Sequence, residues 1–359
     1  MKASTALLSA LSLASAALAT APALADGVPA YQVAKTVTIG APDRWDYVVY
    51  DPPSHRVYVS HGDRVTVVDG QTGEIVGNVE GFPGGTHGIA ISHANGRGYT
   101  DDGGAGEAGA FDLKTLKVGK RIKTAEDADG MAADPVTGHV FTVNGDTGAV
   151  TAIDPKTDTA VATINGGGKL EYAVASGDGK LYVNGAEKKE IVRIDTRTNT
   201  VDAHWPIPNC TSPHGLAADK AGHRLFSTCV NGLMVVVNTD TGATVASLPI
   251  GAGTDAAAFD PRRKLAFSSN GRDGTLSVIQ QKDPNTYVAL EPVKTVVTAR
   301  TMDIDPQTGR IFLVAADIDQ KAAAELAAQA SAPGSAPPRR RGPPFVAGST
   351  KLIFLDPVK

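Results

Sequence analysis

The chain has 359 residues and a formal net charge of −4, with 39 glycines, 22 prolines and only 5% aromatic residues. The slight acidic excess excludes the strongly basic surface that nucleic-acid binding needs, so we expect no nucleic-acid partner. Glycine and proline, together with many Val, Thr and Ile residues, indicate short strands joined by tight turns rather than helices.

Residues 1–25 are expected to be a secretory signal peptide. Lys2 precedes an apolar run rich in alanine and leucine, and Ala23-Leu24-Ala25 forms a small-x-small cleavage site. The alternative is an N-terminal membrane anchor, for which the run is short and alanine-rich. We therefore expect residues 26–359 to be exported to the periplasm or secreted, with no transmembrane segment after signal cleavage.

One phrase recurs along almost the whole chain. Two of its seven copies are "DYVVYDPPSHRVYVS" and "HGIAISHANGRGYT", and successive copies begin 41 to 45 residues apart. This is the length of one four-stranded propeller blade. In the first copy we expect strands at 48–50, 57–60, 65–69 and 74–79. The repeat predicts a single all-β domain at 26–359, a seven-bladed β-propeller of four-stranded antiparallel blades.

The last copy lacks one strand. It has strands at 302–305 and 310–314 and a third in "KLIFLD", after which the chain ends. A spare strand at 32–39 precedes the first copy. We expect this N-terminal strand to pair into the C-terminal blade and close the ring, which removes exposed sheet edges.

Residues 317–349 interrupt the last blade as an insertion. It begins with "KAAAELAAQA", which predicts a short helix, and continues with "SAPGSAPPRRRGPPFVAG", whose composition cannot bury enough apolar surface to fold alone. Connections between second and third strands emerge where first strands begin, so the insertion should lie over that mouth of the channel. It could be a lid, a partner-docking arm or a tolerated insertion without a role.

The two cysteines are expected to form a disulfide. Cys210 lies just before the first strand of its blade and Cys229 ends the antiparallel second strand, so both should reach the same face. A reactive thiol or a soft-metal pair is the alternative.

Every copy of the repeat begins with an ionisable residue, and we call these seven the leading residues. They are Asp46, His87, Asp129, Glu171, His214, Asp255 and Arg300. First strands line a propeller channel, so the leading residues should surround its mouth, where second-strand ends add Asp101 and Asn184. We predict that this polar mouth binds a ligand. The alternative is that these side chains cap the first strands and are solvated.

Four leading residues from successive blades could hold one divalent cation. Asp129, Glu171, His214 and Asp255 offer oxygen and imidazole ligands without thiolates, which suits calcium, magnesium, manganese or zinc. No other cofactor is indicated.

The phrases "HRVYVSHG", "GHVFTVNG" and "GKLYVNG", each followed by a third strand and a Thr-rich turn, resemble the YVTN repeat of exported bacterial propellers, the YncE-like group. The resemblance covers residues 31–356. It implies seven blades and a periplasmic or surface location. That group is also similar to propeller lactonases and to propeller subunits of redox enzymes.

No nucleophile elbow, zincin helix, phosphate loop or haem-attachment motif is present in the sequence. We therefore favour a monomeric, non-catalytic propeller that binds a small molecule or a periplasmic protein. The alternative is a metal-dependent, lactonase-like hydrolase, with His87, Glu171 and Arg300 as catalytic candidates. A third hypothesis, an accessory subunit of a periplasmic dehydrogenase, has no residue to support it.

Overall fold

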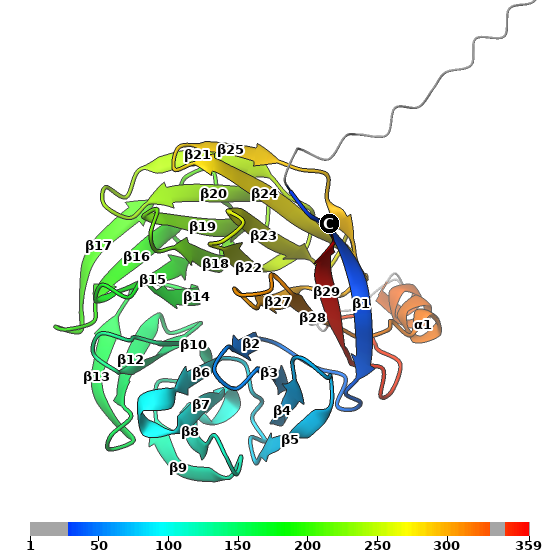
Figure 1. Ribbon diagram of the computed structural model, residues 1–359. Helices are drawn as coiled ribbons and strands as arrows, with labels where there is room; N and C mark the ends of the chain where they lie inside the picture. The colour runs from blue at the N-terminus through cyan, green and yellow to red at the C-terminus, as the bar shows by residue number, and fades with distance from the viewer. Residues whose placement is uncertain (1–27, 331–341, 359) are drawn as a thin grey trace, which may run out of the picture.

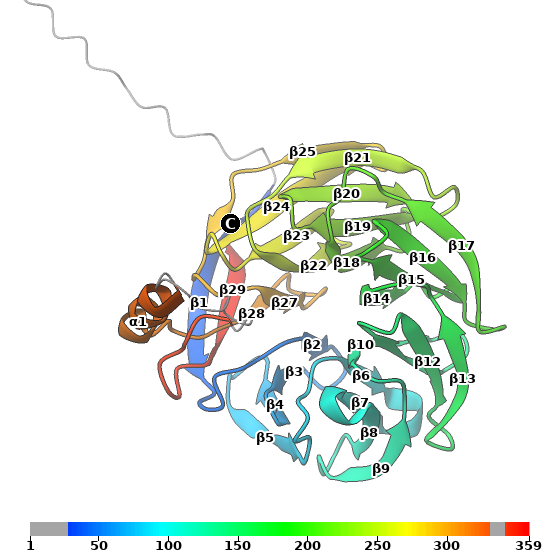
Figure 2. The same ribbon diagram turned by 180° about the vertical axis from the view of Figure 1, so that it is seen from behind.

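The computed structural model describes residues 28–330 and 342–358. In this part of the chain, seven antiparallel sheets are arranged around a central axis as the blades of a propeller (Figure 1). Figure 2 shows the same ring from behind. The predicted all-β, seven-bladed propeller is confirmed.

The strands of each blade follow one another from the channel outwards, except in the last blade. The first three blades are β2 (Val48–Asp51), β3 (Arg56–His61), β4 (Arg64–Asp69) and β5 (Ile75–Glu80); β6 (Ile89–Ser92), β7 (Arg97–Asp102), β8 (Glu107–Asp112) and β9 (Val118–Lys123); and β10 (Ala128–Ala133), β11 (Val140–Asn144), β12 (Ala149–Asp154) and β13 (Thr159–Asn165). Short 3-10 turns η1 (His93–Asn95) and η2 (Gly103–Ala105) lie in the second blade.

The next three blades repeat the pattern, and the sixth carries one extra short strand. They are β14 (Leu170–Ala175), β15 (Lys180–Gly185), β16 (Glu190–Asp195) and β17 (Thr200–Pro206); β18 (Pro213–Asp219), β19 (Arg224–Cys229), β20 (Leu233–Asn238) and β21 (Thr244–Pro249); and β22 (Thr254–Asp260), β23 (Leu265–Asn270), β24 (Thr275–Asp283) and β25 (Thr286–Ala289), with β26 (Val293–Lys294) beside β24.

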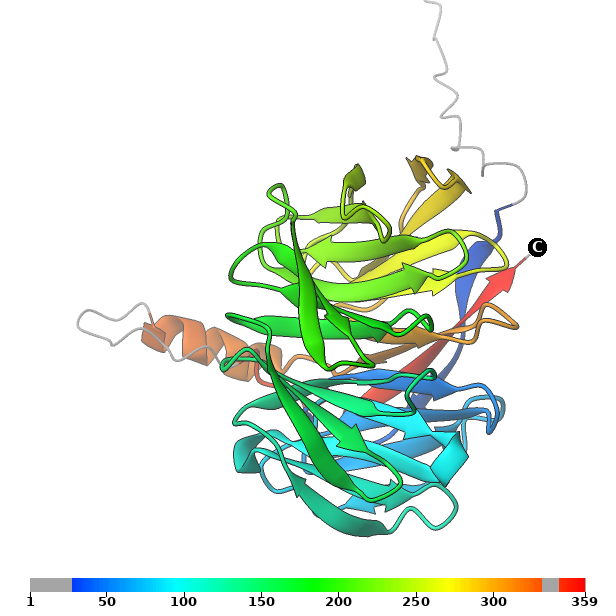
Figure 3. The same ribbon diagram turned by 90° about the vertical axis from the view of Figure 1, so that its left-hand side faces the viewer.

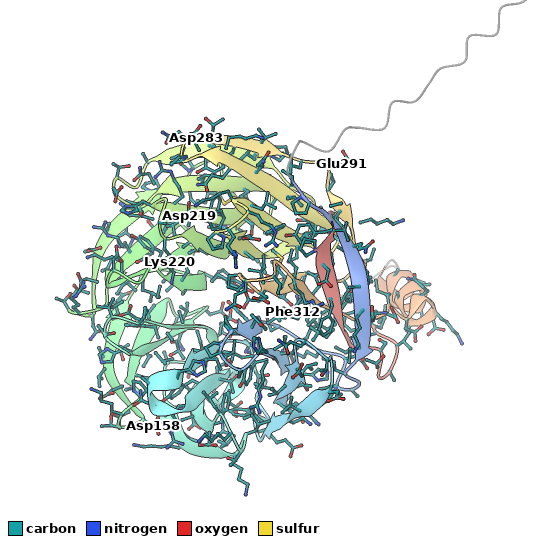
Figure 4. The ribbon with its side chains drawn as sticks, in the orientation of Figure 1. Asp158, Asp219, Lys220, Asp283, Glu291 and Phe312 are labelled. Atoms are coloured by element: carbon teal, nitrogen blue, oxygen red, sulfur yellow. A yellow bond between two sulfur atoms is a disulfide. The ribbon has the colours of Figure 1, made fainter. Side chains whose placement is uncertain are left out.

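The core lies between blades, because each inner strand packs on both of its faces. Alternate side chains of a strand point to opposite faces. In β3, Val57 and Val59 pack with Phe312 of the last blade, whereas Tyr58 packs with Phe111 of the second blade. Figure 4 labels Phe312 toward the inner part of the ring, where its ring stacks on that of Tyr50 at 5.0 Å.

Both ends of the chain build the last blade, in the order β1-β29-β28-β27. The N-terminal strand β1 (Ala30–Thr38) runs antiparallel to β29 (Lys351–Val358), beside β28 (Ile311–Ala315) and β27 (Thr301–Ile304). The register runs from Ala30 opposite Val358 to Thr38 opposite Lys351. The predicted closure of the ring by the N-terminal strand is confirmed.

The insertion between β28 and β29 contains α1 (Gln320–Ala330), which projects beyond one face of the ring (Figure 3). Its base is held by a bridge between Ile318 and Phe345. Residues 331–341, and the expected signal peptide at 1–25, lie outside the described residues. Within the described part of the chain, no helix has the length and apolarity that a membrane span requires.

The predicted disulfide between Cys210 and Cys229 is present, with a Cα–Cα distance of 5.2 Å. Both cysteines are fully buried. Cys229 ends β19 opposite Pro213, the first residue of β18, so the disulfide fixes the chain just before that inner strand. The leading residue His214 follows directly.

Candidate functional site

The leading residues lie where the inner strands begin. Four of them are the second residues of β10, β14, β18 and β22, and the other three lie just before β2, β6 and β27. Their charges act on one another across the ring: the Asp46 carboxylate affects the pKa of leading residues in five other blades. The structure therefore brings the predicted residues together in one electrostatic network.

A bulge releases the leading residue from the strand ladder in four of the blades. The strand register shifts next to the leading residue in β10, β14, β18 and β22, for example between Leu170 and Ala173. A bulge releases residues from the ladder and re-aims their side chains. Glu171 and Tyr172 are the residues released in β14.

His87 and Asp101 form the tightest pair of the site. Nδ1 of His87 lies 2.7 Å from one Asp101 carboxylate oxygen, and the His87 backbone N–H donates to the other oxygen at 2.8 Å. Burial disfavours the charged imidazole, but the hydrogen bond and charge of Asp101 outweigh it and raise the pKa of His87 to about 9. Burial raises the pKa of Asp101 to about 6, against the effect of His87. Near neutral pH the pair is therefore an ion pair.

Three leading carboxylates act on one another electrostatically, and we call Asp46, Asp129 and Glu171 the carboxylate cluster. The side chains of Asp46 and Asp129 accept no hydrogen bond from any described residue. Burial, and then the charge of Asp46, raises the pKa of Asp129 well above its usual range. Burial also raises the pKa of Glu171, although Lys169 lies 3.6 Å away.

Two tyrosines stack across the ring next to this cluster. Tyr47 follows Asp46 in the first blade and Tyr172 follows Glu171 in the fourth, and their ring centroids are 4.2 Å apart. Tyr47 is 6% exposed, and its hydroxyl has no hydrogen-bond partner among the residues described. Burial, and then the charge of Asp129, raises the Tyr47 pKa. We call this stacked pair of Tyr47 and Tyr172, which adjoins the carboxylate cluster in sequence, the aromatic floor.

The remaining predicted residues have structural partners. Arg300 is 2.8 Å from the Asp255 carboxylate and donates to the Trp45 carbonyl at 2.8 Å. The fully buried Asn184 amide donates to the carbonyl of His214 at 2.7 Å. These contacts fit the alternative reading, in which polar side chains support the beginnings of inner strands.

The four residues predicted as metal ligands line the mouth but are not arranged as a ligand set. In residues 28–330 and 342–358, no group of three or more His, Cys, Asp or Glu side chains could hold a metal ion. The divalent cation at Asp129, Glu171, His214 and Asp255 stays a prediction, which metal analysis tests below.

Sequence reasoning missed the aromatic part of the site, namely Trp45, Tyr47, Tyr172 and Phe345. The available signal was local: Trp45 and Tyr47 flank the leading residue Asp46, and Tyr172 follows the leading residue Glu171. Their stacking partners lie more than a hundred residues away in sequence, and the repeat does not indicate which blades face each other.

The raised pKa values predict that the protein loses stability as pH rises. The pKa of His87 rises from 6.5 to about 9, so its stabilising contribution is complete below pH 6.5 and is lost as pH passes 9. Burial raises the pKa of Asp101 and Asp303 from 3.8 to about 6, so these acids also favour the folded state at lower pH. We expect the melting temperature to fall steadily from pH 5 to pH 9.

Thermal melting of the His87→Gln variant checks the origin of this decline. The variant should show a flatter profile between pH 6.5 and pH 9, the interval bounded by the two pKa values of His87. His204→Gln on the outer strand β17 is the control and should keep the decline. A melting temperature that rises over this interval in the unsubstituted protein would contradict the prediction.

Comparison with known proteins gives matches in sequence and in fold. The family model "Domain of unknown function (DUF5074)" matches residues 59–237. The "Uncharacterized protein YncE" of Salmonella typhimurium (strain LT2) is 30% identical over 162 residues, and that of Salmonella typhi is 29% identical. Each match covers 43% of this chain and 45% of the relative, so the chain matches about half the length of these curated relatives.

Solved structures are similar to the ring as a whole. A chain of "Kuenenia stuttgartiensis Hydrazine Synthase" has a TM-score of 0.67 at 14% identity and covers 76% of this chain and 92% of that chain. A chain of "Crystal Structure of Mitotic Checkpoint Complex" has a TM-score of 0.72 at 13% identity, with 99% of both chains covered. At these identities the likeness shows the fold alone.

The protein is thus a closed, seven-bladed β-propeller with ionisable residues around one channel mouth. Within that class, the chain is similar to the YncE-like β-propellers over about half of its length, and its repeat phrases carry the same resemblance.

Proposed function

We propose that this chain is a non-catalytic binding propeller whose channel mouth holds a small organic cation. The observation that carries the proposal is the carboxylate cluster, in which Asp46 and Asp129 lie within each other's electrostatic influence without hydrogen-bond donors. Like charges brought together with partial burial are unfavourable unless a cation neutralises them. An ammonium group supplies three N–H donors for these oxygens.

The aromatic floor supports an organic cation over a bare metal ion. The carboxylates of the cluster do not converge as a metal-binding set. The stacked rings of Tyr47 and Tyr172 adjoin the cluster, and aromatic rings attract cations and accommodate apolar groups. The unpaired Tyr47 hydroxyl offers one more acceptor.

Export to the periplasm or the cell exterior is part of the proposal. The disulfide between Cys210 and Cys229 supports an oxidising compartment. The secretory signal expected at residues 1–25 supports the same location.

Isothermal titration calorimetry with phenethylammonium chloride at pH 7 tests the proposal. We expect saturable one-to-one binding that weakens about tenfold or more in Asp46→Asn, because the variant removes one charge-assisted hydrogen bond. Asp240→Asn, whose side chain is 60% exposed in a turn between β20 and β21, is the control and should bind normally. No binding, or equal binding by Asp46→Asn, would refute the cationic site.

A metal-dependent, lactonase-like hydrolase is the second candidate, and the His87–Asp101 pair favours it. A histidine oriented by a buried carboxylate is a common acid–base arrangement. The raised pKa keeps His87 protonated at neutral pH, which fits a proton donor rather than a general base.

Metal analysis of protein purified without chelator decides between the candidates. We expect no stoichiometric calcium, magnesium, manganese or zinc. Stoichiometric metal that is lost in both Glu171→Ala and His214→Ala would establish the predicted ion site and favour the hydrolase instead.

A further inference from the structure

Two adjoining cavities lie where the insertion meets the channel mouth. The first, of about 570 Å³, is lined by Asp43, Arg44, Asp46 and Gly342. The second, of about 370 Å³, is lined by apolar and small groups such as Val297 and Ile318, and also by Arg272 and Thr298. Trp45, Arg300, Pro343 and Phe345 line both cavities. We call the first the polar compartment and the second the apolar compartment; ligand sites commonly have volumes of about 300–1,000 Å³.

The wall shared by the compartments is aromatic and is completed by the insertion. The Phe345 ring lies 5.1 Å from that of Trp45, and the Arg300 guanidinium lies 5.4 Å from the centroid of Trp45. Trp45 is 3% exposed, and its indole N–H has no acceptor among the described residues.

The polar compartment offers groups of both charges that have no protein partner. The carboxylate of Asp43 is already used, because it accepts hydrogen bonds from Gly348 and Thr350 at 2.6 and 2.9 Å. The carboxylate of Asp46 and the exposed guanidinium of Arg44 have no hydrogen bond or ion pair within the described chain. Arg300 uses Nε and one Nη in its contacts with Asp255 and Trp45, which leaves further N–H donors.

We infer that the ligand is an α-amino acid with an apolar side chain, bound where the insertion root meets the mouth. This inference rests on the proposed function, since the ammonium group binds at Asp46. The α-carboxylate then binds to Arg44 and Arg300 in the polar compartment. The side chain enters the apolar compartment between Phe345, Ile318 and Val297. A zwitterion offers a partner to both Asp46 and Arg44, whereas a simple amine leaves Arg44 unpaired.

Three probes with the same phenyl group separate this inference from the proposed function in calorimetry at pH 7. L-Phenylalanine carries both charges, phenethylammonium carries only the positive charge, and 3-phenylpropanoate carries only the negative charge. We expect L-phenylalanine to bind about tenfold tighter or better than either single-charge probe. Equal or tighter binding of phenethylammonium would overturn the zwitterion inference and leave the cationic site standing. Binding by none of the three would overturn both.

Two variants test where the ligand carboxylate and the ligand side chain bind, and the Arg44 side chain forms no hydrogen bond or ion pair within the described chain. Arg44→Gln should weaken L-phenylalanine about tenfold and leave phenethylammonium unchanged. Phe345→Ala should weaken L-phenylalanine with an unchanged far-ultraviolet spectrum, because Phe345 belongs to the insertion rather than to a blade. Arg262→Gln, an exposed arginine after β22 on the opposite face, is the control. If Arg44→Gln weakens L-phenylalanine no more than this control does, the assignment of the carboxylate fails.

Discussion

Deletion of residues 31–39 is expected to abolish cooperative folding of the ring. The deletion removes nearly all of β1, which pairs with β29 over its whole length. It also removes Tyr31, which packs against Phe267 of the neighbouring blade at 5.3 Å. Loss of one such buried aromatic side chain alone costs about 3–5 kcal/mol, a large part of the stability of a typical protein. The unpaired edge of β29 then invites aggregation.

Thermal unfolding and size-exclusion chromatography check this expectation. The matched control is Val33→Ser, because Val33 lies in the same strand and is 49% exposed. The control should keep the elution volume of the parent and unfold in one transition close to that of the parent. A deletion variant that behaves in the same way would show that the ring does not depend on closure by β1.

Loss of the disulfide is expected to have the second largest effect. Cys210 and Cys229 are 19 residues apart, and a bridge closing a loop of this size stabilises a protein by about 3 kcal/mol. The double variant Cys210→Ala/Cys229→Ala should therefore melt at a clearly lower temperature. It should also bind ligand more weakly, because the Ser212 carbonyl next to the bridge contacts Nδ1 of His214 at 3.2 Å.

Thermal melting of the double variant and of the parent, in the same buffer, measures the expected fall in melting temperature. Ser54→Ala, in the turn after β2, is a control that leaves the bridge intact. An unchanged melting temperature in the double variant would contradict a stabilising role of the disulfide.

The fold could be predicted from the sequence because the repeat encodes it many times. Each copy gives an inner strand, a turn and a second strand in the same order, and the last copy lacks one strand that the N-terminal segment supplies. A strand that is hard to recognise in one copy of the repeat can be placed from its position in the other copies. The predicted helix at 321–330 corresponds to α1 (Gln320–Ala330) for a simpler reason, since its alanine-rich composition favours a helix locally.

The site could be predicted only in part because it depends on differences between copies. The ionisable leading residues were visible as the one register that changes identity. The contact of Tyr47 with Tyr172 could not be predicted from the sequence, because it requires knowing that the first and fourth blades face each other. The packing of Phe345 on Trp45 was hidden in the same way, since the two residues are 300 positions apart and one lies in the insertion.

The central claim is that a cation binds beside the carboxylate cluster at the mouth, and proton release on binding tests this claim directly. Burial, and then the charge of Asp46, raises the pKa of Asp129, and a bound ammonium group should lower that pKa and so favour proton release. Calorimetric titration with phenethylammonium at pH 7, in two buffers of different ionisation enthalpy, counts the protons. We predict net proton release that disappears in Asp129→Asn. Proton uptake, or release unchanged in that variant, would contradict the claim.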